Sequence, residues 1–230
     1  MNNTDNAEKK IAFFDLDGTL IGAHIWLGIV KHHFKFKENR FLTFRYLFSH
    51  FALIFPWKMR LISTERYYRM WGKDMSKMVK GIKIGKAKEF FSWLCDEYLL
   101  PTLKNEVVER LKEHQKNGFL TILASGSFQE LLEVVSDRLN FDFAIGTELE
   151  VAKDKFSGRI IPPLCFNIGK SEKIKNFLEK KNIKIDFKES FAYSDGFFDL
   201  PMLKLVGNPV AVDPDKKLLE FAKNKNWQII

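Results

Sequence analysis

The sequence predicts an α/β fold, with a mostly parallel sheet covered by helices on both faces and a helical region inserted near its start. A buried apolar run opens the chain at residues 11–14, and residues 21–98 place apolar residues at helical spacing. From Pro101 onward, short apolar runs alternate with amphipathic stretches, which indicates strands joined by helices. The 230 residues, 46% of them hydrophobic, suffice for one large core with an insertion.

The first predicted strand ends in two acidic residues, Asp15 and Asp17, followed by Gly18 and Thr19. Because strand side chains repeat every second residue, both carboxylates can project toward one region while Leu16 turns into the core. Two ionised carboxylates at close range repel each other unless one is protonated or a cation lies between them. A hard divalent ion that takes oxygen ligands would match both the negative charge and the type of ligand, and Mg²⁺ is the best candidate. The alternative is a strand followed by an ordinary Asp-Gly turn.

Residues 21–98 are expected to form a helical cap, and residues 1–20 together with 99–230 the core. A helical insertion directly behind a strand end that carries a site would cover that site as a lid. Within the cap, residues 34–71 combine aromatic with basic side chains. This composition suits an amphipathic surface on anionic lipid, a pocket for a phosphorylated headgroup, or helices packed on one another with their basic edges in water.

After the cap, the pattern predicts a regular series of elements. In order they are a helix at 105–116, a strand at 119–124, a turn at 125–127, a helix at 128–138, a strand at 141–145, a small β-hairpin at 149–161 with Ser157-Gly158 between its strands, a helix at 170–181, a strand at 191–194, a short helix at 199–205, a strand at 209–212, a helix at 214–223 with Pro214 in its first turn, and a strand at 227–230.

Three later sites fall at predicted strand ends or helix starts. Ser125-Gly126-Ser127 joins hydroxyls, a glycine and free backbone N–H groups, which can bind an anion or simply cap a helix. Lys170 opens a helix, and its ammonium could neutralise a phosphate or an aspartate; Lys173 is a rival for this role. Asp195 follows a strand and would complete the ligand set of the ion. Asp199 could accept hydrogen bonds from Lys170 or cap a helix.

Together, four stretches resemble the motifs of the haloacid dehalogenase-like (HAD) hydrolase superfamily. In chain order they are Phe14–Leu20, Leu123–Ser127, Lys170 and Ser194–Asp199. The helical insertion after the first motif is similar to that of the phosphoserine phosphatase-like subfamily IB. The stretch Gly207–Asp215 resembles a branch that includes the phosphatidylglycerophosphatase C type. The resemblance implies a Rossmann-like core with a helical cap.

The resemblance also implies roles for these residues in a phosphate monoester hydrolase. Asp15 would attack phosphorus and carry an aspartyl-phosphate, while Asp17 would act as general acid and then general base. Mg²⁺ would be held by Asp15, by the backbone carbonyl of Asp17 and by Asp195. The phosphate would be bound by Gly18, Thr19, Ser125, Gly126, Ser127 and the catalytic lysine Lys170.

One departure from the family pattern concerns the substrate. Phosphoserine phosphatases carry a glutamate a few residues past the first motif that recognises the substrate amine, and the matching place here is His24. A histidine lacks that fixed negative charge, which argues against free phosphoserine; the alternative is that His24 is an ordinary cap histidine. The expected substrate is a small phosphorylated metabolite or the headgroup phosphate of a phospholipid.

Two other functions stay open. One is a phosphotransferase with the same intermediate, and the other is a catalytically silent basic module that binds a membrane or nucleic acid. The net charge of +8 indicates an anionic partner or a solvated lysine-rich surface. Together, Asp15, Asp17, Lys170 and Asp195 argue against the silent module, so no nucleic acid is expected.

Composition also predicts the compartment. The two cysteines share no motif spacing, so we expect reduced thiols in a cytoplasmic protein. Residues 1–10 contain no apolar stretch of signal-peptide type. A peripheral contact with the inner face of an anionic membrane stays open, as does the oligomeric state.

Overall fold

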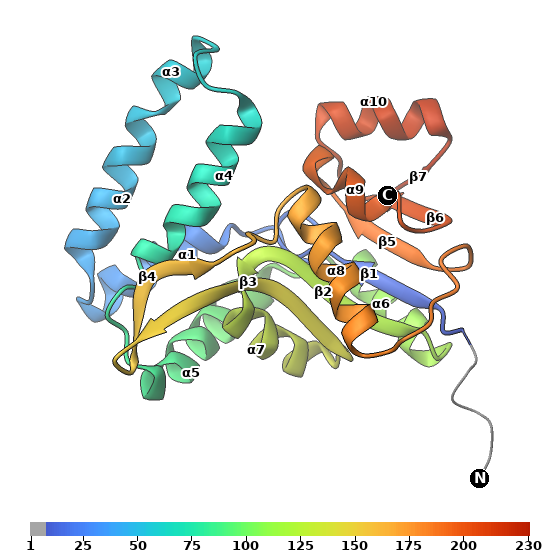
Figure 1. Cartoon of the computed structure of the whole chain (residues 1–230), viewed down its shortest axis with the longest axis horizontal. Coiled ribbons are helices and arrows are strands. Elements are labelled where there is room, and N and C mark those ends of the chain that lie inside the picture. The colour runs from blue at the N-terminus through green and yellow to red at the C-terminus, as the bar shows by residue number, and fades with distance from the viewer. Residues whose placement is uncertain (1–7) are drawn as a thin grey trace.

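A seven-stranded sheet forms the centre of the molecule (Figure 1). The computed structural model describes residues 8–230, and the first residues of the predicted core lie outside this range. The strand order is β4-β3-β2-β1-β5-β6-β7, and every neighbouring pair is parallel except β3 with β4. The strands are β1 (Ile11–Phe14), β2 (Leu120–Phe128), β3 (Phe143–Ala152), β4 (Lys155–Ile161), β5 (Phe191–Ser194), β6 (Asn208–Ala211) and β7 (Gln228–Ile229). The predicted Rossmann-like α/β fold is confirmed.

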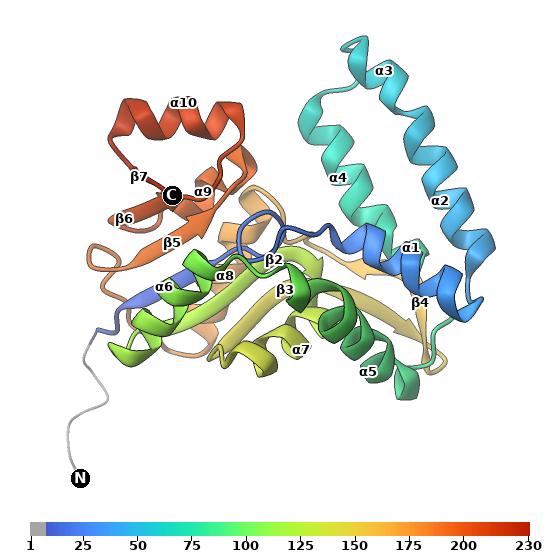
Figure 2. The same ribbon diagram turned by 180° about the vertical axis from the view of Figure 1, so that it is seen from behind.

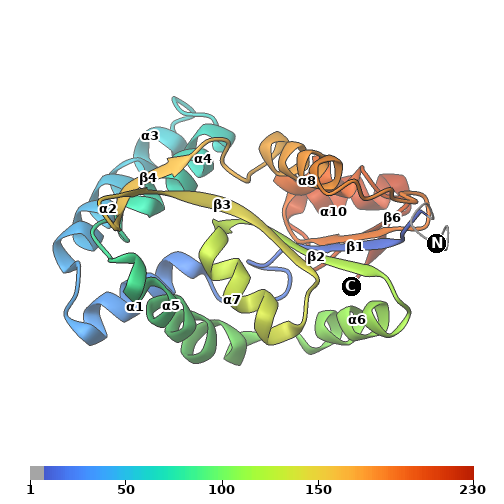
Figure 3. The ribbon, with the colours of Figure 1, turned by 60° about the horizontal axis from the view of Figure 1, so that its bottom comes forward.

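Helices cover both faces of this sheet (Figure 3). One face carries α6 (Asn105–Lys116) and α7 (Gln129–Leu139); the other carries α8 (Ile168–Lys180) and α10 (Lys216–Lys225). Helix α9 (Leu200–Leu203) packs in the same core as α8 and α10. All of β1 is buried between these layers. Its side chains alternate, with Ala12 and Phe14 packed into the core beside α6 and α7 and Ile11 and Phe13 into the core beside α8 and α10. A strand buried on both faces reads as a continuous apolar run, which explains the sequence Ile-Ala-Phe-Phe.

The predicted hairpin forms from β3 and β4, but its predicted turn is wrong. The turn lies at Lys153 and Asp154, whose φ values are 50° and 59°, and β4 runs through Ser157 and Gly158. A two-residue hairpin turn of type I′ needs positive φ at both central residues, and asparagine, aspartate or glycine is preferred there. Gly158 serves another purpose. A Cβ atom at this position would come within 3.0 Å of the Lys80 side chain, so the glycine permits close packing against the cap.

The predicted turn at residues 125–127 is also wrong, because β2 continues through it to Phe128. The pairing of β2 with β3 shifts register between Ala124 and Phe128. Such irregularities re-aim side chains at the end of a strand. The segment is held by the Thr147 hydroxyl of β3, which donates to the Gly126 carbonyl over 2.9 Å. The feature is therefore an irregular strand end and not a free loop.

The remaining predicted elements lie within a few residues of their observed bounds, with two differences. β3 extends well beyond residue 145 because it continues into the hairpin. Helix α10 begins at Lys216, so Pro214 precedes the helix and does not lie in its first turn. Asp215 takes the capping position, where its side chain accepts hydrogen bonds from the backbone N–H groups of Lys217 and Leu218, both over 2.9 Å.

Residues 21–98 are helical, as predicted. Their helices are α1 (Ile25–Phe36), α2 (Arg40–Ala52), α3 (Ile54–Lys58), α4 (Thr64–Asp74) and α5 (Ile84–Trp93). Helices α2, α3 and α4, residues 40–74, form an arm that stands away from the sheet in both views (Figures 1 and 2). The division into core and cap at residues 20 and 99 stays a prediction. None of the helices in the described part of the chain has both the length and the apolar character that a bilayer-crossing segment needs.

Candidate active site

Asp15 lies at the carboxyl end of β1, the middle strand of the sheet. Its backbone N–H donates to the Tyr193 carbonyl of β5 over 3.0 Å, and the residue is 5% exposed. Because strand side chains alternate, Asp15 continues the row of Ile11 and Phe13, which faces α8. A partner for the buried carboxylate therefore has to come from that face.

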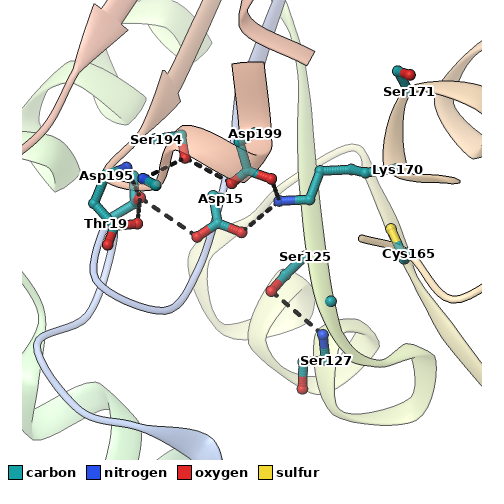
Figure 4. Close-up of polar contacts among 12 residues, drawn as sticks. Asp15, Thr19, Ser125, Ser127, Cys165, Lys170, Ser171, Ser194, Asp195 and Asp199 are labelled. Carbon is teal, nitrogen blue, oxygen red and sulfur yellow. Dashed lines mark hydrogen bonds and ion pairs between the residues drawn. The ribbon is translucent and has the colours of Figure 1, made fainter. Parts of the chain in front are cut away.

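Lys170, in the first turn of α8, is that partner (Figure 4). Its ammonium lies 2.8 Å from Asp15 Oδ1 and 2.6 Å from Asp199 Oδ1, and the residue is 2% exposed. The Ser194 hydroxyl donates to Asp199 Oδ2 over 2.6 Å and so fixes the second carboxylate. Lys173, the rival in the sequence, points elsewhere and pairs with Glu148 at 2.8 Å. The structure thus brings Lys170, and not Lys173, to Asp15.

Thr19 connects Asp15 with Asp195 (Figure 4). Its buried hydroxyl lies 3.1 Å from Asp195 Oδ1 and 3.5 Å from Asp15 Oδ2, so its hydrogen can be donated to either carboxylate. The same oxygen accepts the backbone N–H of Asp195 over 3.0 Å. Carboxylates from two distant parts of the sequence therefore flank one hydroxyl.

Gly18 makes room for this arrangement. A Cβ atom at this position would lie 2.2 Å from Asp195 Oδ2, and the backbone φ of +79° is one that residues with side chains rarely adopt. Its carbonyl accepts a hydrogen bond from the Lys104 ammonium. The glycine is needed here both for space and for backbone conformation.

Asp17 faces the start of α1. Its Oδ1 accepts the backbone N–H of Ile25 over 3.1 Å, which satisfies one of the free N–H groups of that helix end. The side chain lies close enough to Asp195 and Lys170 for both charges to shift its pKa. Asp17 therefore belongs to the same group of charges as Asp15, and it links the first strand to the cap.

The segment Ser125-Gly126-Ser127 is buried beside α8. Ser125 Oγ accepts the backbone N–H of Ser127 over 3.4 Å (Figure 4). The Ser127 hydroxyl is also buried, and it has no hydrogen-bond partner among residues 8–230. A buried hydroxyl without a partner is costly, and a bound ligand oxygen would satisfy it.

The site holds more acidic than basic side chains. Burial is the largest cause that raises the pKa of Asp15 to about 8; Asp199 and Asp195 add to it, and Lys170 opposes it. Burial likewise raises the pKa of Asp17 to about 7, against the hydrogen bond from Ile25. Burial lowers the pKa of Lys170, but its two carboxylate partners outweigh this and raise it, so the lysine stays charged.

This charge balance fits a hard divalent cation. Among the described residues, the Lys170 ammonium alone forms ion pairs with Asp15 and Asp199. Burial and the charge of Asp199 also raise the pKa of Asp195. The donors that converge here are carboxylate, carbonyl and hydroxyl oxygens, which are the ligands that Mg²⁺ prefers. The residues present are thus chemically suited to the predicted metal.

Three further residues support the site and were not predicted from the sequence. Asp215 accepts the backbone N–H of Phe197 over 2.8 Å and donates its own N–H to the Asp195 carbonyl over 2.8 Å. Lys104 bonds Gly18 and pairs with Asp213 at 2.9 Å, and Thr147 holds Gly126. Asp215 lies in a stretch that resembled a known branch, which could have indicated it. Nothing in the local sequence marks Lys104 or Thr147.

His24, the predicted substrate residue, precedes α1 and is exposed. Its side chain does not cap the helix, and Asp17 binds the next residue, Ile25, instead. The position is therefore open to solvent near the proposed acid–base residue. Its role in substrate selection stays a prediction.

Comparison with known proteins agrees with this architecture. The family model described as haloacid dehalogenase-like hydrolase matches residues 12–204. Phosphoserine phosphatase SerB1 of Mycobacterium tuberculosis is 26% identical over 223 residues, which cover 95% of this chain and 69% of that protein. The histidinol-phosphatase of Neisseria meningitidis serogroup C is 26% identical over 233 residues, which cover 96% of this chain and 98% of that protein.

A solved structure shows the same fold. The crystal structure of a protein with unknown function from Bordetella pertussis Tohama I aligns with a TM-score of 0.81 and 21% identity, covering 97% of this chain and 99% of that one. These matches bear on the superfamily and the fold. The finer resemblance to the phosphatidylglycerophosphatase C branch stays a prediction.

Proposed function

The chain belongs to the haloacid dehalogenase-like hydrolase family, and from this premise we propose that it is a Mg²⁺-dependent phosphatase that hydrolyses phosphate monoesters through Asp15. The observation that carries the proposal is the buried arrangement in which Lys170 binds Asp15 at 2.8 Å while Thr19 joins Asp15 to Asp195. One oxygen of the buried Asp15 carboxylate is held by the Lys170 ammonium, and the other lies near the Thr19 hydroxyl. A carboxylate fixed in this way is suited to act as a nucleophile.

The reaction proceeds in two displacements at phosphorus. A carboxylate oxygen of Asp15 forms a bond to phosphorus as the ester P–O bond breaks, and Asp17 gives its proton to the departing alkoxide oxygen. Asp17 then removes a proton from water, whose oxygen attacks the aspartyl-phosphate, and the acyl P–O bond breaks to release inorganic phosphate and free Asp15. A pKa of about 7 suits Asp17 to both roles near neutral pH.

Asp15, Asp195 and the backbone carbonyl of Asp17 would hold Mg²⁺, which supplies positive charge where an anionic nucleophile meets an anionic phosphate. Lys170 and the Ser125 hydroxyl hold phosphate oxygens, together with the Gly126 N–H. Such donors stabilise the charge that shifts onto the oxygens in the transition state.

The substrate class is a small phosphorylated molecule. Two relatives are named phosphoserine phosphatase and histidinol-phosphatase, and both names denote amino-acid-derived phosphate esters. His24, which we predict to occupy the place of the amine-binding glutamate of phosphoserine phosphatases, is exposed. We therefore expect free phosphoserine to be a poorer substrate than an ester without a free amine next to a carboxylate, and a panel of phosphate esters tests this order.

Phosphate release from p-nitrophenyl phosphate, with and without EDTA, tests the proposal. Wild type should turn over only with the metal, and Asp15→Asn should lose roughly a thousandfold or more, as expected for a residue that forms a covalent bond. The matched control is Asp137→Asn, an exposed aspartate on α7 that should keep wild-type activity. Turnover that survives EDTA, or that survives Asp15→Asn in a folded protein, would refute the assignment. Transfer of the phosphoryl group to added alcohols in preference to water would favour the phosphotransferase.

A further inference from the structure

Five phenylalanines of the helical arm are exposed. Phe41, Phe44, Phe48 and Phe51 of α2 and Phe55 of α3 are 74%, 64%, 69%, 49% and 71% exposed. Their spacing alternates between three and four residues, so they follow one face of a nearly continuous helix. Met59 and Leu61, at the turn after α3, extend the row and are 56% and 75% exposed. We refer to these seven side chains as the apolar row.

Apart from Phe51, whose ring lies 5.9 Å from that of Trp71, the apolar row is not the inner face of the arm. The opposite face of α2 carries the buried residues Thr43, Tyr46 and His50. The Tyr46 hydroxyl donates to the Trp71 carbonyl of α4 over 3.1 Å, and the two rings lie 5.4 Å apart. The arm thus has its own packed interior, and the apolar row is a second face. Exposed apolar surface of this extent marks an interaction site in a soluble protein.

The same stretch carries only positive charge. Between Glu38 and Glu65 the sequence contains no aspartate or glutamate, but it contains the exposed residues Arg40, Arg45, Lys58 and Arg60. None of these four forms an ion pair with any of residues 8–230. The apolar row is therefore accompanied by cationic side chains without anionic partners.

Charge decides what covers this face. A second copy docked through the same face would bring four unpaired cations toward four others, and like charges at an interface oppose association. An anionic phospholipid bilayer offers an apolar boundary for the phenylalanines and negative headgroups for the cations. The ring of a phenylalanine is well suited to the interfacial region, while Lys and Arg reach the headgroups with their long side chains.

We propose that the outer face of α2 and α3 docks on the surface of an anionic phospholipid bilayer. The apolar row enters the interfacial region, and Arg40, Arg45, Lys58 and Arg60 bind lipid phosphates. This inference concerns a partner of the arm and is independent of the proposed reaction. The arm nevertheless touches the active-site segment, because the Tyr68 ring of α4 lies 5.7 Å from the ring of Phe198, close behind Asp195.

Cosedimentation with large unilamellar vesicles tests the proposal on the full chain. Vesicles of phosphatidylcholine with phosphatidylglycerol should sediment wild type, whereas pure phosphatidylcholine vesicles should bind at least about tenfold less, and salt should weaken the binding. Phe44→Ser/Phe48→Ser and Arg45→Glu/Lys58→Glu should each reduce binding about tenfold or more, since each removes one component of the interaction.

The controls change similar side chains elsewhere. Val151→Ser/Ile161→Ser alters two apolar residues of the hairpin that are 50% and 46% exposed, and Lys216→Glu/Lys223→Glu alters exposed charges of α10. Both should bind as wild type does. The four double variants should keep circular dichroism spectra and p-nitrophenyl phosphate turnover unchanged, so loss of binding is separate from loss of the reaction.

Three results would overturn the proposal. The first is equal binding to neutral and anionic vesicles, or no binding to either. The second is full binding by Phe44→Ser/Phe48→Ser. The third is a dimer, detected by light scattering after size exclusion, that the same variant abolishes while vesicles have no effect; a second copy would then cover the face.

Discussion

At the scale of single residues, Gly18 shows how the site depends on one missing side chain. Alanine at this position would place its Cβ 2.2 Å from Asp195 Oδ2 in a backbone with φ of +79°. We expect Gly18→Ala to lower the free energy of unfolding by roughly 1–3 kcal/mol and to weaken metal-dependent turnover strongly, because Asp195 must move. Urea unfolding and phosphatase kinetics measure the two effects.

Gly85→Ala is the matched control for this change. Gly85 lies in α5, and a Cβ atom there would meet nothing within 4 Å. It should therefore stabilise the protein by about 0.4–1 kcal/mol and leave kinetics unchanged. If Gly18→Ala retained wild-type metal dependence, the close approach of Gly18 to Asp195 would have no catalytic importance.

Some residues of the site can be identified from the sequence, and others only from the structure. Asp15, Asp17 and Asp195 follow apolar strands, a pattern that an ordinary Asp-Gly turn shares, so they are selected only together with the other motifs of the chain. Lys170 and Lys173 cannot be separated by local pattern, since both open the same helix; only the packing of α8 shows that Lys170 reaches Asp15 and that Lys173 pairs with Glu148. The contacts of Lys104 with Gly18 and of Thr147 with Gly126 join distant segments, and no local pattern predicts them.

At the scale of elements, Asp215, the N-terminal capping residue of α10, also binds the active-site segment at Phe197. Asp215 binds three backbone N–H groups, those of Phe197, Lys217 and Leu218. Asp215→Ala should cost about 1–2 kcal/mol of stability through the lost cap. It should also raise the Mg²⁺ concentration needed for half-maximal turnover, because the Phe197 N–H, two residues after Asp195, loses its acceptor.

Ser63→Ala separates these two effects. Ser63 caps α4 by accepting the Arg66 N–H over 3.2 Å, in the arm and away from Asp195. This variant should lose a comparable amount of stability and keep the wild-type Mg²⁺ dependence. If the two variants showed the same metal dependence, Asp215 would be only a helix cap.

Elements with a strong local signal were predictable, and their ends were less so. The amphipathic pattern predicted α6 correctly, and the apolar run of β5 was equally clear. The hairpin turn was misplaced because Gly158 looked like a turn residue, whereas its glycine permits packing against Lys80. The strand β2 was cut short because Ser125-Gly126-Ser127 has the composition of a turn; its pairing with β3 holds it in the sheet.

At the scale of the whole molecule, the strand order creates the site. β1 lies between β2 and β5, so Asp15, the Ser125 segment and Asp195 meet at the carboxyl ends of three adjacent parallel strands. Alternation of strands and helices predicts a parallel sheet, but it does not specify which strands are neighbours. The molecule carries a net charge of +8, while its centre gathers carboxylates around one lysine. The proposed cation would offset the negative charge of these carboxylates.

The covalent step at Asp15 can be tested directly by acid quench and peptide mass spectrometry during turnover of p-nitrophenyl phosphate. The p-nitrophenolate leaves without a proton, so Asp17→Asn should slow only the release of phosphate from Asp15. With Mg²⁺, this variant should accumulate a peptide that carries one phosphoryl group on Asp15, and EDTA should abolish it. Continued p-nitrophenol release with no phosphorylated Asp15 peptide would contradict the account.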